Sequence, residues 1–467
     1  MQLETISDIR EYSKFIFNLY RDDEFFKDNK TGLLSVVCGA KSPFRNNSVQ
    51  KMVAVRESGR TLCQVVFIIH KNSSELMSFA FFEALSGQQE AVLILIDNAL
   101  EFAKSHSASK IVFGLDGHCN NSVGYALESQ GFPSFGESYN KAYYSDYFKD
   151  FSAVKFVSFY DDIANVNSQV NKDLLVLNRQ ISRSINMQTI STTKEEQLQT
   201  ESMKTTLEKQ LRTDSINTTK EEKPRTDNIN TTKEEQLQTE SIELHKIENC
   251  NETNTNHDNQ NYNMQTANIK INDSNKIDIG FMEKYFSDTL NVSLEKSDFG
   301  INGFKETMRR YTDLNNCIFI NHRYYFKRDY EEDYDLFNSM RPLLKNENLI
   351  FAKRNGVDVG FMLWYPDFNC YVPKGKGAGI STFLKYRILK ISPSIAKVVE
   401  IGLVDSERNS GLILMLFAKA IFYANKYKGI KKVTSGWILD ENTPSKNITK
   451  RYTKNLNKEF VTYEKVV

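Results

Sequence analysis

The chain has 467 residues, which is enough for two or three domains that each bury their own core. Its formal net charge of +1 provides no overall field that would attract nucleic acid or an anionic membrane. The six cysteines include no C-x-x-C pair, and no apolar run is as long as a membrane span, which argues against a zinc cage, a disulfide framework and a transmembrane protein. We therefore expect a cytoplasmic protein that binds no metal.

Residues 1–160 alternate between helical and strand patterns. Two helices are expected, at Ile6–Phe26 and Gln88–Ala103. Strands are expected at Met52–Val55, Leu62–Ile69, Met77–Leu85, Lys110–Phe113 and Val154–Tyr160. Helices over a mostly antiparallel sheet predict an α/β, or α+β layered, domain.

Residues 161–276 differ in composition. They are rich in Asn, Thr, Gln, Lys and Glu, and TTKEEQLQTES at Thr192 recurs at Thr231 as part of a thirteen-residue repeat. This period matches no common solenoid unit, and the repeat lacks the apolar stripe that solenoid units stack. We therefore predict a disordered linker with transient helix in its KEEQLQ pieces, or alternatively a binding arm.

Residues 277–467 resume the pattern of the first segment. A helix is expected from Phe304 to about Asn315, and two strands joined by Asn355-Gly356 predict a hairpin. A long strand is expected from Ile395, followed by a buried helix. A strand at Lys432–Leu439, a short helix after Pro444 and a final strand at Glu459–Val467 complete the segment.

The stretch Lys397–Leu416 combines a buried strand, a polar loop and an apolar helix. This geometry directs the first free N–H groups of the helix beyond the strand end, where the helix dipole favours an anion. Arg408 adds positive charge, and Gly411 would let a ligand approach the backbone. Residues 371–467 also carry about eighteen Lys and Arg against seven Asp and Glu, which is either an anion-binding surface or a solvated basic face.

The element order and the motif Arg408-Asn409-Ser410-Gly411-Leu412-Ile413 resemble the GNAT acyltransferase superfamily, whose pattern is R/Q-x-x-G-x-G/A. More of the chain resembles a subgroup of tandem GNAT-like bacterial proteins of unassigned substrate. The resembling pieces include Ser42-Pro43-Phe44, the Gly114–Gly124 loop and YNKAYY in the first half, and GFMLWYPDFN and GWILDENTP in the second. The resemblance implies two GNAT-like domains, 1–160 and 277–467, with the coenzyme motif only in the second.

The resemblance also implies that acetyl-CoA or another acyl-CoA binds the second half as co-substrate. Backbone amides of the motif would hold the pyrophosphate, and the pantetheine would lie between two splayed strands. The residues that this assigns to the coenzyme are Leu403, Val404, Arg408, Asn409, Ser410, Gly411, Leu412, Ile413 and Asn442. Ile413 departs from the small residue of the family, and Thr449 stands where many members have a tyrosine that protonates the thiolate.

Three side chains are candidates for proton transfer. Glu400 on the long strand could be a base, although such a residue is often paired. Tyr452, three residues after Thr449 and on the same helical face, is a candidate acid or a packing residue. His118 in the Gly114–Gly124 loop could reach a cleft between the halves or be solvated.

The sequence thus predicts an acyltransferase, of the N-acetyltransferase type, for a small-molecule or peptide amine, with a hydroxyl or thiol acceptor left open. One alternative is a non-catalytic protein that binds acyl-CoA or acyl carrier protein, which Ile413 and the missing tyrosine favour. Another is a tandem GNAT aminoacyl transferase that uses charged tRNA. The near-zero net charge argues against the last, and we expect no nucleic-acid partner.

Overall fold

A computed structural model describes residues 1–127, 131–137, 139–214 and 279–467. Residues Met1–Asn178 and Asn275–Val467 form one compact unit, and Arg179–Ser274 forms a second, which contains most of the repeat. Residues 215–278, including the repeat copy at Thr231, lie outside the described residues. Helix α6 (Ile163–Asp214) occupies the beginning of the segment predicted as linker. Its first part belongs to the compact unit, because Val166, Val170 and Leu174 are buried there.

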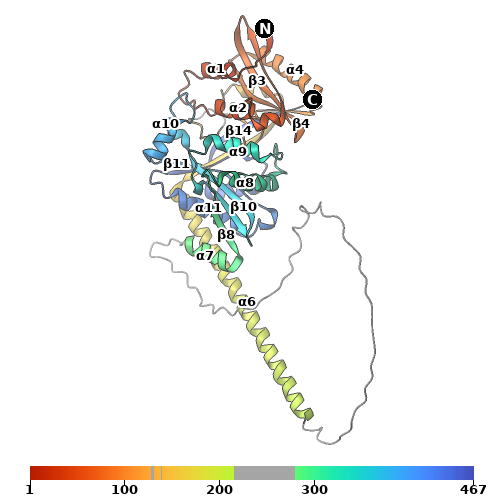
Figure 1. Cartoon of the computed structure of the whole chain (residues 1–467), viewed down its shortest axis with the longest axis vertical. Coiled ribbons are helices and arrows are strands. Elements are labelled where there is room, and N and C mark those ends of the chain that lie inside the picture. The colour runs from red at the N-terminus through yellow and green to blue at the C-terminus, as the bar shows by residue number, and fades with distance from the viewer. Residues whose placement is uncertain (128–130, 138, 215–278) are drawn as a thin grey trace, which may run out of the picture. The chain divides into compact units, whose positions relative to one another are not determined.

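The first half contains the predicted alternation of helices and strands (Figure 1). Its elements are β1 (Gln2–Thr5), α1 (Ile9–Leu19), α2 (Lys30–Cys38), α3 (Pro43–Asn46), β2 (Ser48–Glu57), β3 (Arg60–His70), β4 (Ser73–Ala84), α4 (Gln89–Ser105), β5 (Lys110–Phe113), β6 (Tyr125–Ala126), α5 (Tyr144–Phe148) and β7 (Ser152–Asp162). Helix α1 is shorter than predicted, because Asp8 caps its start and the helix ends before Tyr20.

The second half follows the same plan. Its elements are α7 (Ile279–Leu290), β8 (Val292–Lys296), α8 (Phe304–Phe319), α9 (Tyr330–Met340), β9 (Leu349–Arg354), β10 (Val357–Pro366), α10 (Ile380–Phe383), β11 (Ile395–Leu403), α11 (Leu412–Ala424), β12 (Lys432–Ser435), β13 (Ile438–Leu439), α12 (Thr443–Tyr452) and β14 (Asn455–Val466). The Asn355-Gly356 hairpin is confirmed: both residues have positive φ and Val357 pairs with Arg354. Helix α11 is largely buried, as predicted.

A single mixed sheet runs through both halves in the order β1-β2-β3-β4-β5-β14-β7-β12-β11-β10-β9-β8. Its pairs are antiparallel except β4 with β5 and β11 with β12, which confirms the mostly antiparallel α/β prediction. The two halves exchange strands at the centre. The C-terminal strand β14 lies between β5 and β7, and β7 from the first half pairs with β12 of the second.

The exchange joins the hydrophobic cores of the two halves. Phe326 from the second half packs in the same cluster as Tyr12 and Ile16 of the first. Tyr324 and Tyr325 share another cluster with Val112. The predicted domains 1–160 and 277–467 are therefore parts of one compact unit with a common sheet.

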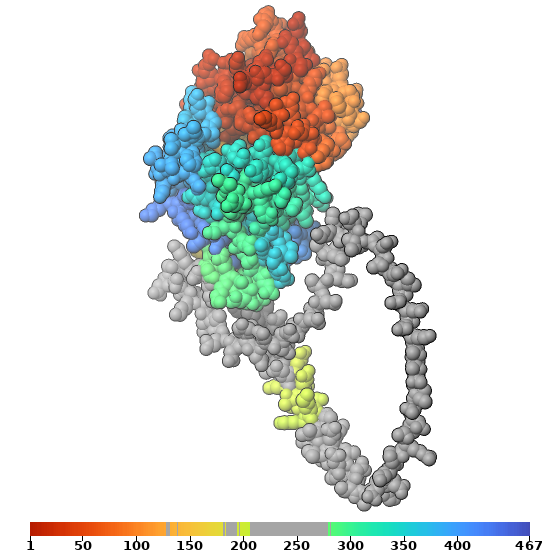
Figure 2. Space-filling model, viewed as in Figure 1, coloured from red at the N-terminus to blue at the C-terminus, as the bar shows by residue number. Residues whose placement is uncertain are grey.

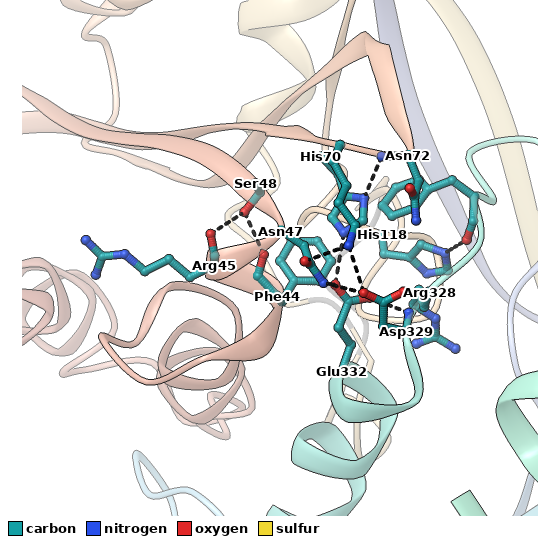
Figure 3. A network of polar contacts seen from close by, with 12 residues as sticks. Phe44, Arg45, Asn47, Ser48, His70, Asn72, His118, Arg328, Asp329 and Glu332 are labelled. Atoms are coloured by element: carbon teal, nitrogen blue, oxygen red, sulfur yellow. Dashed lines mark hydrogen bonds and ion pairs between the residues drawn. The ribbon is translucent and has the colours of Figure 1, made fainter. Parts of the chain in front are cut away.

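A network of polar contacts also links the halves (Figure 3). The Asn47 amide donates to Asp329 and Glu332 at 3.0 and 2.6 Å. The His70 ring nitrogen Nε2 lies 3.0 Å from Glu332, and Lys71 pairs with Asp329 at 2.8 Å. Since His70 and Glu332 are both buried, this contact fixes the end of β3 against the start of α9.

Candidate functional site

Strands β11 and β12 separate partway along their length. They pair only where Ile395–Val398 faces Lys432–Ser435, and the last bond of the pair runs from the Gly436 N–H to the Val398 carbonyl at 2.6 Å. The strand predicted over Lys432–Leu439 is therefore wrong in one respect: it breaks after Ser435. The chain turns away there, and β13 pairs with β7 instead.

The separation leaves one edge of β11 open. The Val404 N–H donates to Val359 on the opposite side, toward β10. Because backbone groups alternate in direction along a strand, the N–H groups of Ile401 and Leu403 point to the open side. A bulge adds Val399 between the pairs Leu363–Glu400 and Trp364–Val398. The result is a groove with free backbone donors on one wall.

The loop after β11 presents the N-terminus of α11. Gly411 is the N-cap with φ of +80°, the Ser410 hydroxyl accepts from the Leu412 N–H at 3.4 Å, and the N–H groups of Asn409, Gly411 and Ile413 have no hydrogen-bond partner within the described part of the chain. Glu407 anchors this loop to β9, because its carboxylate accepts from Arg354 Nε and Nη2 at 2.6 and 2.9 Å. An ordered group of free donors at a helix N-terminus suits an anion.

The groove and this helix end open into a cavity of about 1590 Å³ between the two halves. Six of the residues predicted from the sequence line it: Glu400, Leu403, Arg408, Asn409, Ile413 and Asn442. Four others, Val404, Ser410, Gly411 and Leu412, lie in or beside the loop but do not line the cavity. The structure thus brings together most of the residues that the sequence assigned to the coenzyme.

Gly411 and Asn442 have structural duties that the sequence did not reveal. A Cβ on Gly411 would lie 3.3 Å from Leu177 of α6, so the Leu177 side chain packs against the position that a Cβ would take. Glycine at this position also serves the positive φ and this packing, in addition to the expected approach of a ligand to the backbone, which stays a prediction. The Asn442 side chain caps α12 by accepting from the Ser445 N–H at 3.2 Å.

Glu400 lies in the cavity wall among neutral partners. Tyr311 OH donates to it at 2.7 Å, and the Asn120 amide donates at 3.3 Å from the other half. Burial raises the pKa of the Glu400 carboxyl, and hydrogen bonds from Tyr311 and Asn315 together with the charge of Arg328 oppose this shift only in part. Glu400 therefore has the properties of a base: it lines a cavity, and burial raises the proton affinity of its carboxyl.

Tyr452 and His118 do not line the cavity. The Tyr452 ring stacks on Phe417 with centroids 4.2 Å apart, and burial and Asp173 raise the pKa of its hydroxyl. The buried His118 ring accepts at Nδ1 from the Asn120 N–H (3.0 Å), and its Nε2 lies 3.1 Å from the Phe326 carbonyl (Figure 3). Burial lowers the pKa of His118 well below its usual value, so the ring is neutral.

Asn120 and Tyr311 were missed by sequence reasoning. Asn120 belongs to the Gly114–Gly124 loop, which drew attention only for His118. Tyr311 lies on the buried side of α8, where it looks like any core aromatic residue. Only the tertiary structure shows that both donate to Glu400, because they come from different halves of the chain.

In the first half, side chains fill the place that corresponds to the groove between β11 and β12. Strands β4 and β5 are parallel and joined by α4, as β11 and β12 are joined by α11. Here the tyrosines of α5 and its N-cap fill the space. The Tyr144 hydroxyl accepts from the Ala84 N–H. The Tyr147 hydroxyl donates to the Leu85 carbonyl and accepts from the Gln88 N–H.

Two negative observations apply to the residues described. No helix among them combines the length and apolar character needed to cross a membrane. Nor do three or more His, Cys, Asp or Glu side chains gather there as metal ligands would.

No family model matches the sequence, and no curated protein matches it. Among solved structures, the chain is similar to a tandem GNAT protein from the clavulanic acid biosynthesis pathway, with 8% identity and a TM-score of 0.45 over 100% of this chain and 98% of that one. It is also similar to a GCN5-related N-acetyltransferase from Sphaerobacter thermophilus, with 8% identity and a TM-score of 0.42 over 100% and 95% of the two chains. The chain is also similar to an aminoglycoside N-acetyltransferase in complex with CoA, with 17% identity and a TM-score of 0.23; the aligned region covers 34% of this chain and 86% of that one.

Proposed function

We propose that the protein is an acyl-CoA-dependent acyltransferase, of the N-acetyltransferase type, that acylates an amine bound between its two halves. The observation that supports this most directly is the groove between β11 and β12, which ends at the free N–H groups of the α11 N-terminus and opens into the cavity that contains Glu400. A thin ligand with an anionic end matches that shape.

The residues fit acyl-CoA as the donor. The free N–H groups at Asn409, Gly411 and Ile413 would hold the pyrophosphate. Arg408 lies at the exposed edge, where its guanidinium pairs with Asp405 at 2.6 Å. The amide-bearing pantetheine arm would hydrogen-bond to the open edge of β11 at Ile401 and Leu403, as a peptide strand does. The thioester would then lie near the bulge at Val399, next to Glu400.

Glu400 would accept the proton of the attacking amine. The amine nitrogen forms a bond to the thioester carbon, the carbon–sulfur bond breaks, and the CoA thiolate leaves with the electron pair and later takes up a proton. The backbone donors of the separated strand would stabilise the oxyanion. Because Tyr452 lies outside the cavity lining, it is not assigned to protonate the thiolate.

The acceptor would enter from the side of the cavity contributed by the first half. The carboxylates Asp28, Asp116 and Glu137 line that side together with Asn120 and the cations Lys27 and Lys30, so it offers both donors and acceptors to a polar acceptor. The cavity, at about 1590 Å³, exceeds the usual volume of a small-ligand pocket, so it has room for a coenzyme arm and a small-molecule or peptide acceptor together.

Coenzyme binding can be tested with Ile413→Asp. A carboxylate in the first turn of α11 suits the helix dipole, so the fold is retained, but it repels a bound pyrophosphate. We expect saturating acetyl-CoA, at a hundred times its Kd, to stabilise the parent protein by about 2.7 kcal/mol and the variant by far less. Ile413→Asn is the matched control and should keep most of the shift. Equal stabilisation of all three proteins by acetyl-CoA would show that the coenzyme does not bind at this helix end.

The second candidate is a protein that binds acyl-CoA or acyl carrier protein without catalysis. The position of Tyr452, which stacks on Phe417 instead of lining the cavity, favours it. Release of CoA thiol from acetyl-CoA over a panel of amines separates the two: coenzyme binding without release by any amine would favour the second candidate.

A further inference from the structure

A second feature of the surface is the segment Lys374–Ile391, which we call the basic-apolar segment. It contains five cations and no Asp or Glu: Lys374, Lys376, Lys385, Arg387 and Lys390. The surrounding stretch 368–399 also lacks acidic residues. Since the whole chain has a net charge of only +1, this concentration of positive charge is local.

The same segment exposes large aliphatic side chains. It consists of a glycine-rich loop, helix α10, a π-helical turn at Leu384–Ile388 and a short extension. The exposed side chains are Ile380 (81%), Leu384 (45%), Ile388 (59%), Leu389 (66%) and Ile391 (47%). The first three are spaced by four residues and so lie along one side of the helical run. This part of the chain lies on the surface in Figure 2, coloured light blue.

The opposite side of the segment is fixed to the core. Tyr386 is buried, shares a hydrogen bond of 2.9 Å with Tyr427 and contacts the Tyr371 ring. Tyr371 OH donates to the Ile391 carbonyl at 2.7 Å. These contacts prevent the helical run from rotating, so its aliphatic side chains cannot turn inward.

The cations of the segment are not neutralised by the protein. None of the five forms an ion pair with a residue in the described ranges. Lys385 is close enough to Lys27 to lower the pKa of the Lys27 ammonium, in addition to the effect of burial. Lys27 also lies 4.8 Å from the ring of Phe132, another exposed apolar side chain. The neighbourhood therefore combines unpaired positive charge with exposed apolar area.

We propose that the basic-apolar segment docks the protein on an anionic lipid surface. The aliphatic side chains would enter the boundary between headgroups and acyl chains, and the lysines would contact lipid phosphates. An acidic carrier protein shares the negative charge. A fluid lipid surface fits better, because exposed aliphatic residues and cations are interspersed along the same helical run, so that one contact buries the aliphatic side chains while the cations meet phosphates.

The docked surface would adjoin the large cavity. Ile380 and Phe383 of α10 line that cavity, as do Gly377 and Gly379 before it. The loop also touches the first half, because the Asp28 N–H donates to the Lys376 carbonyl and the Gly375 N–H donates to the Phe26 carbonyl. Docking does not depend on the proposed acyl transfer, since apart from Ile380 the side chains it uses lie outside the cavity lining.

Co-sedimentation of the full chain with vesicles tests the proposal. We expect binding to vesicles that contain phosphatidylglycerol, weaker binding at high salt, and no binding to vesicles of phosphatidylcholine alone. Changing Lys374, Lys376 and Lys390 together to Gln should weaken binding roughly 100-fold, given the usual contribution of each basic side chain near such a surface. Ile380→Ser with Ile388→Ser should remove most of the binding, and any binding that remains should still weaken at high salt.

Two controls address exposed residues elsewhere. Ile301→Ser removes an aliphatic side chain that is more exposed than any in the segment, and Lys14→Gln with Lys104→Gln removes exposed cations. Both should bind vesicles like the parent. Equal binding of segment and control variants, or no binding to anionic vesicles, would overturn the proposal. Binding of a purified acidic carrier protein that is lost in the same segment variants, without vesicle binding, would assign the surface to that partner instead.

Discussion

Replacement of Glu400 by Gln tests the chemistry of the proposed site. The change keeps the size of the side chain and an oxygen that accepts from Tyr311 OH, now at 2.7 Å, but it removes the negative charge and the ability to take a proton. The new amide N–H₂ faces the Asn120 amide, another donor, at 3.3 Å. One neighbour must therefore reorient, which is a small structural cost beside the loss of the base.

The expected loss of rate is large. A positioned general base contributes roughly 10²- to 10⁴-fold, so kcat/KM for amine acylation should fall by about that factor. The Kd for acetyl-CoA should change little, because the groove and the α11 terminus are untouched. Glu441→Gln, which changes an exposed carboxylate that also lines the cavity, is the matched control and should retain activity.

The stability of the Gln variant gives an independent readout. The folded-state pKa of Glu400 is raised above its unfolded value, so the native state favours the protonated carboxyl. Stability from this group is present below the unfolded pKa of about 4.3 and is lost as pH rises through the folded pKa, by about 1.4 kcal/mol for each pH unit that separates the two pKa values. At neutral pH the variant should thus be as stable as the parent or more stable.

The assay is thiol release followed from pH 5 to 9, together with thermal unfolding at each pH. The parent should lose activity as pH falls through the raised pKa of Glu400, and the variant should lack that limb. Full activity of Glu400→Gln, or a limb that persists in it, would show that another group accepts the proton.

Three further predictions follow from single contacts. Gly436→Ala would place a Cβ 2.7 Å from the Val399 carbonyl oxygen, so we expect the free energy of unfolding to fall by about 1–3 kcal/mol and CoA to bind at least about tenfold more weakly. Calorimetry measures both quantities, and no change in either would mean that the backbone around the groove has room for a Cβ. His118 has a lowered pKa, so the unfolded chain binds a proton below pH 6.5 that the native state does not; stability should fall with acidification by up to about 1.4 kcal/mol per pH unit, and His118→Gln should flatten that slope in denaturant titrations, whereas an identical slope would refute the assignment. Deletion of β14 removes the partner of both β5 and β7, so circular dichroism and limited proteolysis should report unfolding in both halves, and a stable first half in that truncated chain would contradict the strand exchange.

The sequence by itself determined the local elements and the anion-binding loop. The alternation around Asn355-Gly356 required a hairpin, since these two residues adopt positive φ at low cost. The apolar run after Gly411 required a buried helix, and the short polar loop that joins it to the preceding strand leaves free N–H groups at the helix start. These features depend on neighbours in the chain, so a local pattern is enough to predict them.

Only the tertiary structure decided how the halves are joined and which side chains surround Glu400. The pairing of β14 with β5, and of β7 with β12, connects residues hundreds of positions apart, and no period in the sequence encodes that exchange. Tyr452 and His118 looked like catalytic candidates, but their hydrogen bonds and stacking direct them into the protein. Asn120 and Tyr311 gained their role from packing, because burial of a carboxyl requires donors and the nearest ones come from different halves.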